Sequence, residues 1–329
     1  MIYNSLINTE DNIINKNKGV IKMEKTFIFG HTSPDTDSIT SSIVMENLEK
    51  KLGNEGAKAY RLGKLNKETE YVLNYFDVPA PELLEEIEEK ANVILVDHNS
   101  FVQSVKGIEN ANITKVVDHH SISEFETKAP LFYLAEPVGC TETILYELYK
   151  VNNVEIDSKI AGLMLSAIIS DTLLFKSPTC TEKDVKIAHE LAKISGIDIE
   201  KYGMEMLKAG TDLSDYTAEE LINIDSKEFE ANGKKVQVAQ VNTACIEDVL
   251  KDKDDIENAI NSFIRENSID LFLLAITDII NSNSQAIVLG EKTDLFEKSF
   301  NVKLENNMAF LPGVVSRKKQ IIPVIKENA

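Results

Sequence analysis

Three short apolar segments of this 329-residue chain each end in a histidine, an aspartate or both. They read "FIFGH", "VILVDHN" and "KVVDHH", and they place His31, Asp97 and Asp118 at their carboxyl ends. Compact β-branched runs of this kind are typical of strands buried in a parallel sheet. The carboxyl ends of parallel strands share one rim, and ligands bind at that rim in open α/β sheets. The polar groups are therefore expected to converge there.

Helical periodicity alternates with these strands and indicates a doubly wound α/β domain with a mainly parallel sheet. Apolar residues recur at helical spacing between the strands, and Ser38 is a possible N-cap of the first helix. The predicted helices cover residues 38–52, 140–153, 158–170 and 181–196, and the predicted strands cover residues 25–30, 92–97, 113–118 and 131–137.

The pattern changes after residues 208–220, which are small and polar. Asn232–Gly233 then separates two alternating runs, which is a strong hairpin signal. A charged helix is predicted over residues 245–267, followed by paired strands over residues 269–279 and 284–290. This region indicates a smaller α/β domain built on a mixed sheet.

The chain is accordingly divided into residues 1–22, 23–210, 211–217 and 218–329. The first part has neither the apolar core of a secretory signal nor the Arg-rich pattern of a transit peptide. We expect it to be a disordered tail or a start-site artefact, since a methionine stands directly before the first strand. The third part is expected to be a hinge linker, which would suit a site that closes on its substrate.

Composition excludes several classes of protein. The formal net charge is −19, with 54 acidic and 35 basic residues, which argues against a general nucleic-acid-binding surface. No apolar segment approaches the roughly 18 to 20 residues that a membrane-spanning helix needs. Cys140, Cys180 and Cys245 lack CxxC spacing, so neither a disulfide framework nor a zinc ribbon is indicated. We expect a cytoplasmic protein with no nucleic-acid or membrane partner.

Four of the five histidines lie at the predicted strand ends: His31, His98, His119 and His120. A further acid, Asp171, follows an apolar helix in "ISDTLLF". Any one such histidine alone is more often a packed or surface residue, but four of them beside acids indicate a metal site. Aspartate and histidine without cysteine favour a harder or borderline divalent ion such as Mn²⁺ or Co²⁺ over structural zinc.

The segment "GHTSPDTDS" permits two interpretations. His31, Asp35 and Asp37 can all face a cation if the loop turns back over the strand end. Alternatively, Asp35 or Asp37 caps the following helix through an Asx-turn, and the histidine is unrelated. These residues alone do not decide between the two.

Four motifs in this order, "GHTSPDTDS", "VDHN", "VDHH" and "SDT", resemble the DHH phosphoesterase superfamily. The closer resemblance is to its manganese-dependent, family II inorganic pyrophosphatases, and it extends from Met23 to the C-terminus. It includes "SRKKQ", residues 316–320, which resembles the basic substrate-binding motif of that family. The resemblance implies a DHH metal-binding catalytic domain over residues 23–210 and a DHHA2-like substrate-binding domain over residues 218–329.

The resemblance also implies two Mn²⁺ ions per subunit, with Co²⁺ as a possible substitute, and a homodimer. The implied ligands are His31 and Asp35 for one ion, Asp37, His119 and Asp171 for the other, and Asp97 for both.

The neighbours of these ligands receive different roles. His120 is expected to contact phosphate, by the same resemblance. Asp118 is expected to orient nearby residues through hydrogen bonds rather than to bind metal. His98 has no ligand role carried over from the family, and it is also expected to support the ligands rather than to bind metal.

Charge counting indicates that a polyanionic substrate needs further cations, because four carboxylates roughly cancel two divalent ions. Lys227, Arg317 and Lys318 match basic substrate-binding positions of the family, and Mg²⁺ is expected to arrive with the substrate. The alternative interpretation of "SRKKQ" is a basic run that is exposed to solvent and has no binding role.

The implied reaction is hydrolysis of pyrophosphate to two phosphates by a water activated between two metal ions. His120 and the three basic residues are expected to neutralise phosphoryl charge.

Two alternatives remain open. The first is another DHH enzyme, such as an exopolyphosphatase or a phosphodiesterase acting on short oligonucleotides or cyclic dinucleotides. Many such phosphodiesterases carry a "GGGH" motif, which is absent here, and no histidine follows His189. The second is a metal or phosphate sensor without turnover, against which the complete set of expected ligands and cations argues.

Overall fold

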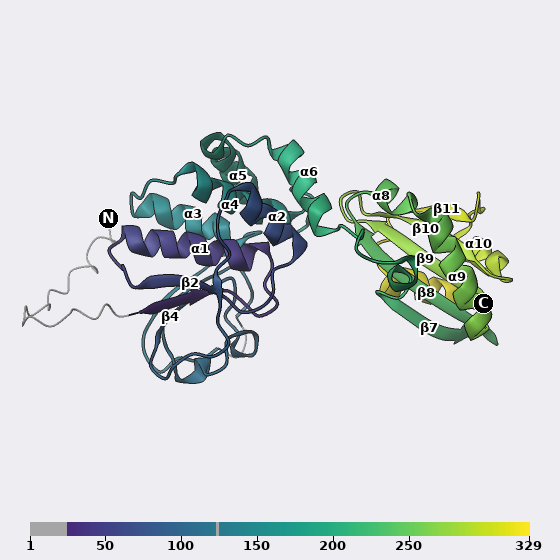
Figure 1. Ribbon diagram of the computed structural model, residues 1–329, viewed down its shortest axis with the longest axis horizontal. Helices are drawn as coiled ribbons and strands as arrows, with labels where there is room; N and C mark the ends of the chain where they lie inside the picture. The colour runs from purple at the N-terminus through teal and green to yellow at the C-terminus, as the bar shows by residue number, and fades with distance from the viewer. Residues whose placement is uncertain (1–24, 123–124) are drawn as a thin grey trace, which may run out of the picture.

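The computed structural model describes residues 25–122 and 125–329. Figure 1 shows an N-terminal domain in purple to teal and a C-terminal domain in green to yellow, joined after helix α6 (Ile199–Gly210). The expectation for residues 1–22 lies outside the described ranges. Within those ranges, no helix combines the length and the hydropathy that a membrane span requires.

The N-terminal domain is built on a parallel sheet, as predicted. Its strands in the described residues are β1 (Thr26–Phe29), β2 (Ala57–Arg61), β3 (Glu82–Leu83), β4 (Asn92–Val96), β5 (Asn112–Asp118) and β6 (Phe132–Ala135). They lie in the order β3-β2-β1-β4-β5-β6, and each neighbouring pair is parallel. The order reverses between β1 and β4, which places a topological switch point at the carboxyl ends of these two strands.

The two faces of this sheet are covered differently. Helices gather on one side in Figure 1. They are α1 (Thr36–Lys51), α2 (Lys67–Tyr75), α3 (Thr141–Val151), α4 (Ser158–Thr172), α5 (Glu182–Ser195) and α6. On the other face, strand residues such as Phe29 and Leu95 pack against the short 3₁₀ turns η2 (Phe101–Gln103) and η3 (Ile108–Asn110) and the loops around them.

Helix α4 is apolar on all sides because it lies in the centre of the helical layer. Every residue from Ile160 to Ile169 is buried, and the helix packs against both α1 and α5. At Gly162 a Cβ atom would stand 2.2 Å from the ring of Phe76, so this close approach requires glycine. The buried helix gives rigid support to its last turn, which contains Asp171.

The C-terminal domain has a mixed sheet, also as predicted. Its strands in the described residues are β7 (Ser226–Ala231), β8 (Lys234–Thr243), β9 (Leu271–Asp278), β10 (Asn283–Leu289) and β11 (Met308–Pro312). Their order is β11-β10-β9-β8-β7, with β8 and β9 parallel and the other pairs antiparallel. Asn232 and Gly233 have positive φ values of 48° and 73° in the turn between β7 and β8, which confirms the predicted hairpin.

Both faces of the mixed sheet are covered, which explains the continuous apolar run in β9. Phe272 and Leu274 belong to a core shared with α9 (Lys253–Asn267), whereas Leu271 and Leu273 belong to a core on the opposite face. The remaining helical segments are α7 (Ala218–Leu221), α8 (Ile246–Leu250), α10 (Thr293–Phe300), α11 (Ile322–Asn328) and the π-helical turn η4 (Arg317–Ile321).

Three local predictions were wrong. The N-cap of α1 is Asp35 rather than Ser38, whose backbone N–H instead donates to Asp35 Oδ1 at 3.0 Å. The single helix predicted over residues 245–267 is two helices, because the backbone leaves the helical region at Asp252 with ψ of 21°. Asp171 does not follow α4 but lies inside its last turn, since α4 extends to Thr172.

The segment between α6 and α7 is fastened to both domains. Lys67 Nζ of α2 lies 3.3 Å from Asp212 Oδ2 and 2.6 Å from Asp215 Oδ2. Thr211 Oγ1 accepts a hydrogen bond of 2.9 Å from the backbone N–H of Ala244, which directly follows β8. The two domains are thus connected through a short segment that has polar contacts on either side.

Candidate metal centre

The candidate ligands meet at the switch point of the parallel sheet. His31 lies just after β1, Asp97 directly after β4 and His119 directly after β5. Asp35 and Asp37 lie at the start of α1, which follows β1. The structure also brings Asp171 to this rim from the last turn of α4.

Asp97 lies between the two histidines. Its Oδ2 is 3.4 Å from His31 Nε2, and its Oδ1 is 3.4 Å from His119 Nε2. The residue is 2% exposed, and its backbone has a left-handed φ of 58°. A non-glycine residue in this region is held there at a cost by the surrounding structure. Each oxygen of one carboxylate therefore faces a different histidine.

His31, Asp35 and Asp97 form one group of potential ligand atoms. Asp35 has two contacts with different partners: Oδ1 caps α1, while Oδ2 lies 3.4 Å from His31 Nε2. The cap and the cation-facing arrangement are therefore compatible in one side chain. Capping also fixes the carboxylate, because its rotation would break the bond to Ser38 N–H.

Asp37 and Asp171 form a second group, together with the thiol of Cys140. His119 Nε2 lies 3.9 Å from Asp37 Oδ2 and 3.9 Å from Asp171 Oδ2. Asp37 is fully buried, and its Oδ1 accepts a hydrogen bond of 2.8 Å from Ser41 Oγ. The structure thus brings together all six residues that the sequence predicted as metal ligands.

Backbone carbonyls hold the two histidines. His31 Nδ1 lies 2.8 Å from the carbonyl of Thr32, and His119 Nδ1 lies 3.1 Å from the carbonyl of Val138. A carbonyl can only accept, so Nδ1 carries the proton in both rings. When the rings are neutral, Nε2 is left as the metal-binding atom, and it is Nε2 that faces the carboxylates.

The acids of the rim are crowded. Burial and the neighbouring Asp97 raise the pKa of Asp37 to about 7. Burial and the neighbouring Asp37 raise the pKa of Asp171 well above its usual range. Burial also acts on Asp97, but His119 and His31 outweigh it and hold its pKa well below its usual range.

The histidines show the complementary effect. Burial opposes protonation of His31, but Asp35 and Asp97 outweigh burial and raise its pKa to about 11. Burial likewise opposes protonation of His119, whereas Asp97 and Asp37 raise its pKa to about 9. Protonated histidines therefore supply the positive charge that these carboxylates need when no metal ion is bound.

The donor set fits divalent cations. It offers imidazole nitrogens and carboxylate oxygens, which suit Mn²⁺ and ions of similar hardness. Four buried or partly buried carboxylates within one rim also need positive charge nearby. Asp35, Asp37, Asp97, Asp171, His31 and His119 could hold such ions.

The neighbours of the ligands lie at different distances from the rim. Asp118 Oδ1 accepts hydrogen bonds from the backbone N–H and Nδ1 of His120, at 3.1 and 2.9 Å. His120 Nδ1 is also 3.7 Å from Asp97 Oδ1. His98 is buried away from the ligands, with Nδ1 at 3.0 Å from the Val96 carbonyl and Nε2 at 3.2 Å from Ser104 Oγ.

The three predicted substrate-binding cations lie on the C-terminal domain. Lys227 is exposed on β7, and Lys318 is exposed in η4. The guanidinium of Arg317 forms an ion pair with Asp225, and its backbone N–H donates to Gln240 Oε1 at 2.8 Å. Among the described residues, no hydrogen bond or ion pair joins these cations to the candidate ligands.

Cys140 and Thr141 also lie at this rim, although the sequence patterns did not predict them. Cys140 joins the group of Asp37 and Asp171, and Thr141 donates hydrogen bonds to Asp37 and Asp97. A signal was present, because the predicted strand over residues 131–137 ends at the same rim as the other strands. No histidine or aspartate directly follows that strand, so its contribution to the rim was not predicted.

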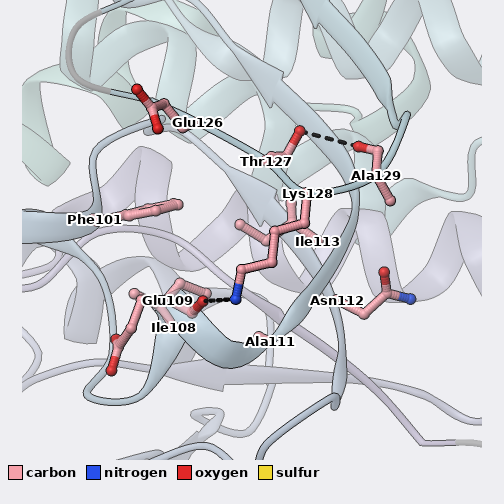
Figure 2. Close-up of a pocket in the computed structure, with 10 residues that line it drawn as sticks. All are labelled: Phe101, Ile108, Glu109, Ala111, Asn112, Ile113, Glu126, Thr127, Lys128 and Ala129. Atoms are coloured by element: carbon pink, nitrogen blue, oxygen red, sulfur yellow. Dashed lines mark hydrogen bonds between the residues drawn. The ribbon is translucent and has the colours of Figure 1, made fainter.

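A separate cavity of about 230 Å³ lies on the face of the sheet that carries the 3₁₀ turns. Figure 2 shows its lining, in which Lys128 Nζ donates to the carbonyl of Glu109 at 3.4 Å. Asn112, the first residue of β5, also lines it, whereas the metal centre lies past Asp118 at the last residue of β5. The cavity is therefore not part of the candidate metal centre.

Two family models match the chain. The model for the N-terminal domain of the DHH family matches residues 25–168, and the model for the DHHA2 domain matches residues 204–328. The first range contains five of the six candidate ligands, and the second contains all three candidate substrate-binding cations.

Similar proteins match over nearly their whole length. A relative from Bacillus subtilis, named manganese-dependent inorganic pyrophosphatase, is 56% identical over 306 residues, which is 93% of this chain and 99% of the relative. A relative from Bacillus velezensis, named probable manganese-dependent inorganic pyrophosphatase, has the same identity and coverage. The crystal structure of a putative family II inorganic pyrophosphatase from Methanococcus jannaschii is 41% identical, with a TM-score of 0.59, and covers 92% of this chain and 99% of its own.

Proposed function

The chain belongs to the family of manganese-dependent inorganic pyrophosphatases, and we propose that it hydrolyses pyrophosphate to two phosphates at the rim around Asp97. The observation that carries this proposal is the position of Asp97, whose two oxygens face His31 and His119 separately. A carboxylate in this position can be shared by two cations, as two-metal hydrolysis requires.

Two Mn²⁺ ions are proposed for each chain, with Co²⁺ as a possible substitute. His31 and Asp35 hold one ion, Asp37, His119 and Asp171 hold the other, and Asp97 contributes to both. When bound, the ions supply Lewis-acid chemistry that lowers the pKa of a water molecule and offsets charge on phosphoryl oxygens. The separate contacts of Asp35 with His31 and of Asp37 with His119 support this division.

The side chains of the metal domain have further roles. The carbonyls of Thr32 and Val138 hold the histidine rings so that Nε2 faces the rim. His120 contacts the substrate phosphate, and its Nδ1 bond to Asp118 leaves Nε2 as the donor towards an oxygen anion. Asp118 also raises the pKa of His120, which favours the charged ring beside a polyanion.

The C-terminal domain supplies the remaining positive charge. Four carboxylates roughly balance two divalent ions, so Lys227, Arg317 and Lys318 are needed to bind pyrophosphate, together with Mg²⁺ that arrives with it. The metal domain spans residues 23–210 and the substrate domain spans residues 218–329. Closure about residues 211–217 brings the cations onto the rim. The exposure of Lys227 and Lys318 and the short connection between the domains support this step.

The reaction is tested by substrate choice. Phosphate release is measured from pyrophosphate and tripolyphosphate, and mononucleotide release from a dinucleotide, each with Mn²⁺ and with Mg²⁺, after chelation and metal readdition. We expect the fastest release from pyrophosphate, with Mn²⁺. Faster cleavage of tripolyphosphate would instead identify an exopolyphosphatase, and cleavage of the dinucleotide a phosphodiesterase. Binding of pyrophosphate by the Mn²⁺-loaded protein without phosphate release would identify a sensor.

Cellular setting and assembly form a separate proposal. We place the protein in the cytoplasm, which agrees with its three free cysteines, and assign it no nucleic-acid or membrane partner. A homodimer is proposed from family resemblance. Light scattering coupled to size-exclusion chromatography tests the dimer, and a single-chain mass at assay concentration would contradict it.

A further inference from the structure

The segment from Val138 to Thr141 contacts three of the candidate ligands, although it contains no predicted site residue. The carbonyl of Val138 accepts from His119 Nδ1 at 3.1 Å. The backbone N–H of Thr141 donates to Asp37 Oδ2 at 2.8 Å, and Thr141 Oγ1 donates to Asp97 Oδ1 at 3.1 Å. This segment connects β6 with α3, and its residues 139–141 are buried.

Thr141 joins the carboxylate proposed for both ions to one proposed for a single ion. It is fully buried and is the first residue of α3. Through its amide and its hydroxyl it binds Asp37 and Asp97, which are remote in the sequence. The donor to Asp97 is a side-chain hydroxyl, so a substitution can remove this bond and keep the backbone bond to Asp37.

The segment is itself held in place by hydrogen bonds to Asp184. The backbone N–H of Gly139 donates to Asp184 Oδ2 at 2.9 Å, and Thr143 Oγ1 donates to Asp184 Oδ1 at 2.6 Å. A Cβ atom at Gly139 would lie 2.9 Å from both Asp184 Oδ2 and Thr172 Cγ2. The fully buried Asp184 therefore anchors the segment, and only a residue without a side chain fits at Gly139.

We propose that Thr141 is a positioning residue of the metal centre, which holds Asp97 and Asp37 at a fixed spacing so that both ligand sets are formed before the ions bind. The proposal rests on the metal centre described under Proposed function. Residues that hydrogen-bond to metal ligands orient them, and their loss typically lowers metal affinity by about 10- to 100-fold.

Three variants of the full-length protein test this role. Thr141→Val removes the hydroxyl at nearly constant volume, and Thr141→Ser restores it. Tyr149→Phe is a matched control, because it removes a second buried hydroxyl of α3, which donates to the Val44 carbonyl at 2.8 Å rather than to a candidate ligand or to Asp184. Binding is followed by the electron paramagnetic resonance signal of free Mn²⁺, and folding by circular dichroism and thermal unfolding.

We expect Thr141→Val to lower Mn²⁺ affinity by about 10- to 100-fold, with Thr141→Ser within roughly threefold of the unsubstituted protein. Tyr149→Phe should lower the melting temperature and leave Mn²⁺ affinity unchanged. Equal Mn²⁺ affinity in the unsubstituted protein and Thr141→Val would overturn the proposal, and so would an equal loss in Tyr149→Phe. Failure of the unsubstituted protein to bind Mn²⁺ would overturn the metal centre itself and the role of Thr141 with it.

Discussion

The two halves of the proposed active site differ in how completely folding has built them. The metal half draws its ligands from strand ends and helix termini of one rigid domain, and hydrogen bonds fix His31, Asp37 and His119. The cationic half lies on another domain, where Lys227 and Lys318 are exposed and have no ion pair within the described residues. The comparison indicates that metal binding depends on one domain, whereas substrate binding depends on how both domains come together.

Substitution of Asp97 should have the largest effect, because its two oxygens face one histidine from each proposed ligand set. Asp97→Asn keeps the shape but removes the charge, so we expect kcat/KM to fall by roughly 10³-fold or more. Mn²⁺ affinity should fall by more than about 100-fold, which exceeds the loss typical of a residue that only hydrogen-bonds to a metal ligand. Isothermal titration and phosphate release measure the two effects. Asp77→Asn, at a fully exposed position of the same domain, is the control and should change neither.

Substitution of Arg317 tests whether metal binding is independent of substrate binding. Arg317→Ala removes one of the cations proposed for pyrophosphate, and we expect kcat/KM to fall by about 10²-fold. Mn²⁺ affinity should stay within about twofold, since the metal domain holds its ligands without this residue. Lys303→Ala is the control, because it removes an exposed cation of the same domain that pairs with Glu297 and lies outside "SRKKQ". A matching loss of Mn²⁺ affinity in Arg317→Ala would show that the halves are not independent.

The pH dependence of Mn²⁺ binding tests the metal half alone. Asp37, with a pKa of about 7, and His119, with a pKa of about 9, must lose protons before they bind metal. Affinity should therefore rise between pH 6 and 9, by roughly tenfold per pH unit for each proton released. A pH indicator in weakly buffered solution should also detect proton release on Mn²⁺ addition. A pH-independent affinity would contradict these charges.

The stability of the metal-free protein should change in the opposite direction. The folded state raises the pKa of His119 from 6.5 to about 9, so this group stabilises the fold fully below pH 6.5. The contribution is lost as the pH rises from 6.5 to about 9. Thermal unfolding of chelated protein over this interval measures it, and His119→Gln is the control that should show a smaller decline.

The smallest effect is expected at the connection between the halves. Lys67→Ala removes the ion pairs with Asp212 and Asp215, which are exposed, so the unfolding free energy should change by less than about 1 kcal/mol. Looser coupling of the domains should change KM by roughly two- to threefold. Lys159→Ala removes an exposed ion pair with Asp77 inside one domain and should leave KM unchanged. An equal KM in both variants would show that the linker contacts do not affect closure.

Sequence patterns predicted those parts of the fold that depend on neighbouring residues. The strands ending at His31, Asp97 and His119 are dense in β-branched residues, and their ends could be assigned directly. Strand β2, "AKAYR", was not predicted because it contains no β-branched residue. Its place in the sheet comes from parallel pairing with β1, which a local pattern does not reveal.

The candidate site shows the same division between features that local sequence predicts and contacts that join residues distant in sequence. Five candidate ligands lie in segments that follow β1, β4 or β5, and Asp171 lies in the "SDT" motif, so they could be found. Thr141, by contrast, binds Asp37 across 104 residues of sequence. Arg317 meets Asp225 across 92 residues, so this contact was equally hidden. At Asp35 the sequence left a choice between a helix cap and a metal ligand. The structure shows that Oδ1 caps the helix while Oδ2 faces His31, so the two interpretations were not exclusive.

The most direct test of the difference between the two halves is a distance across the domains. A nitroxide is attached at Glu230→Cys, an exposed position on β7, in a protein whose Cys180 and Cys245 are replaced by serine. Pulsed electron paramagnetic resonance then measures the distance from this label to Mn²⁺ bound at the rim, with and without a non-hydrolysable pyrophosphate analogue. A preassembled metal half and a movable cationic half predict that the analogue shortens this distance while the number of bound Mn²⁺ ions stays the same. An unchanged distance with the analogue bound would contradict closure of the cationic half onto the metal half.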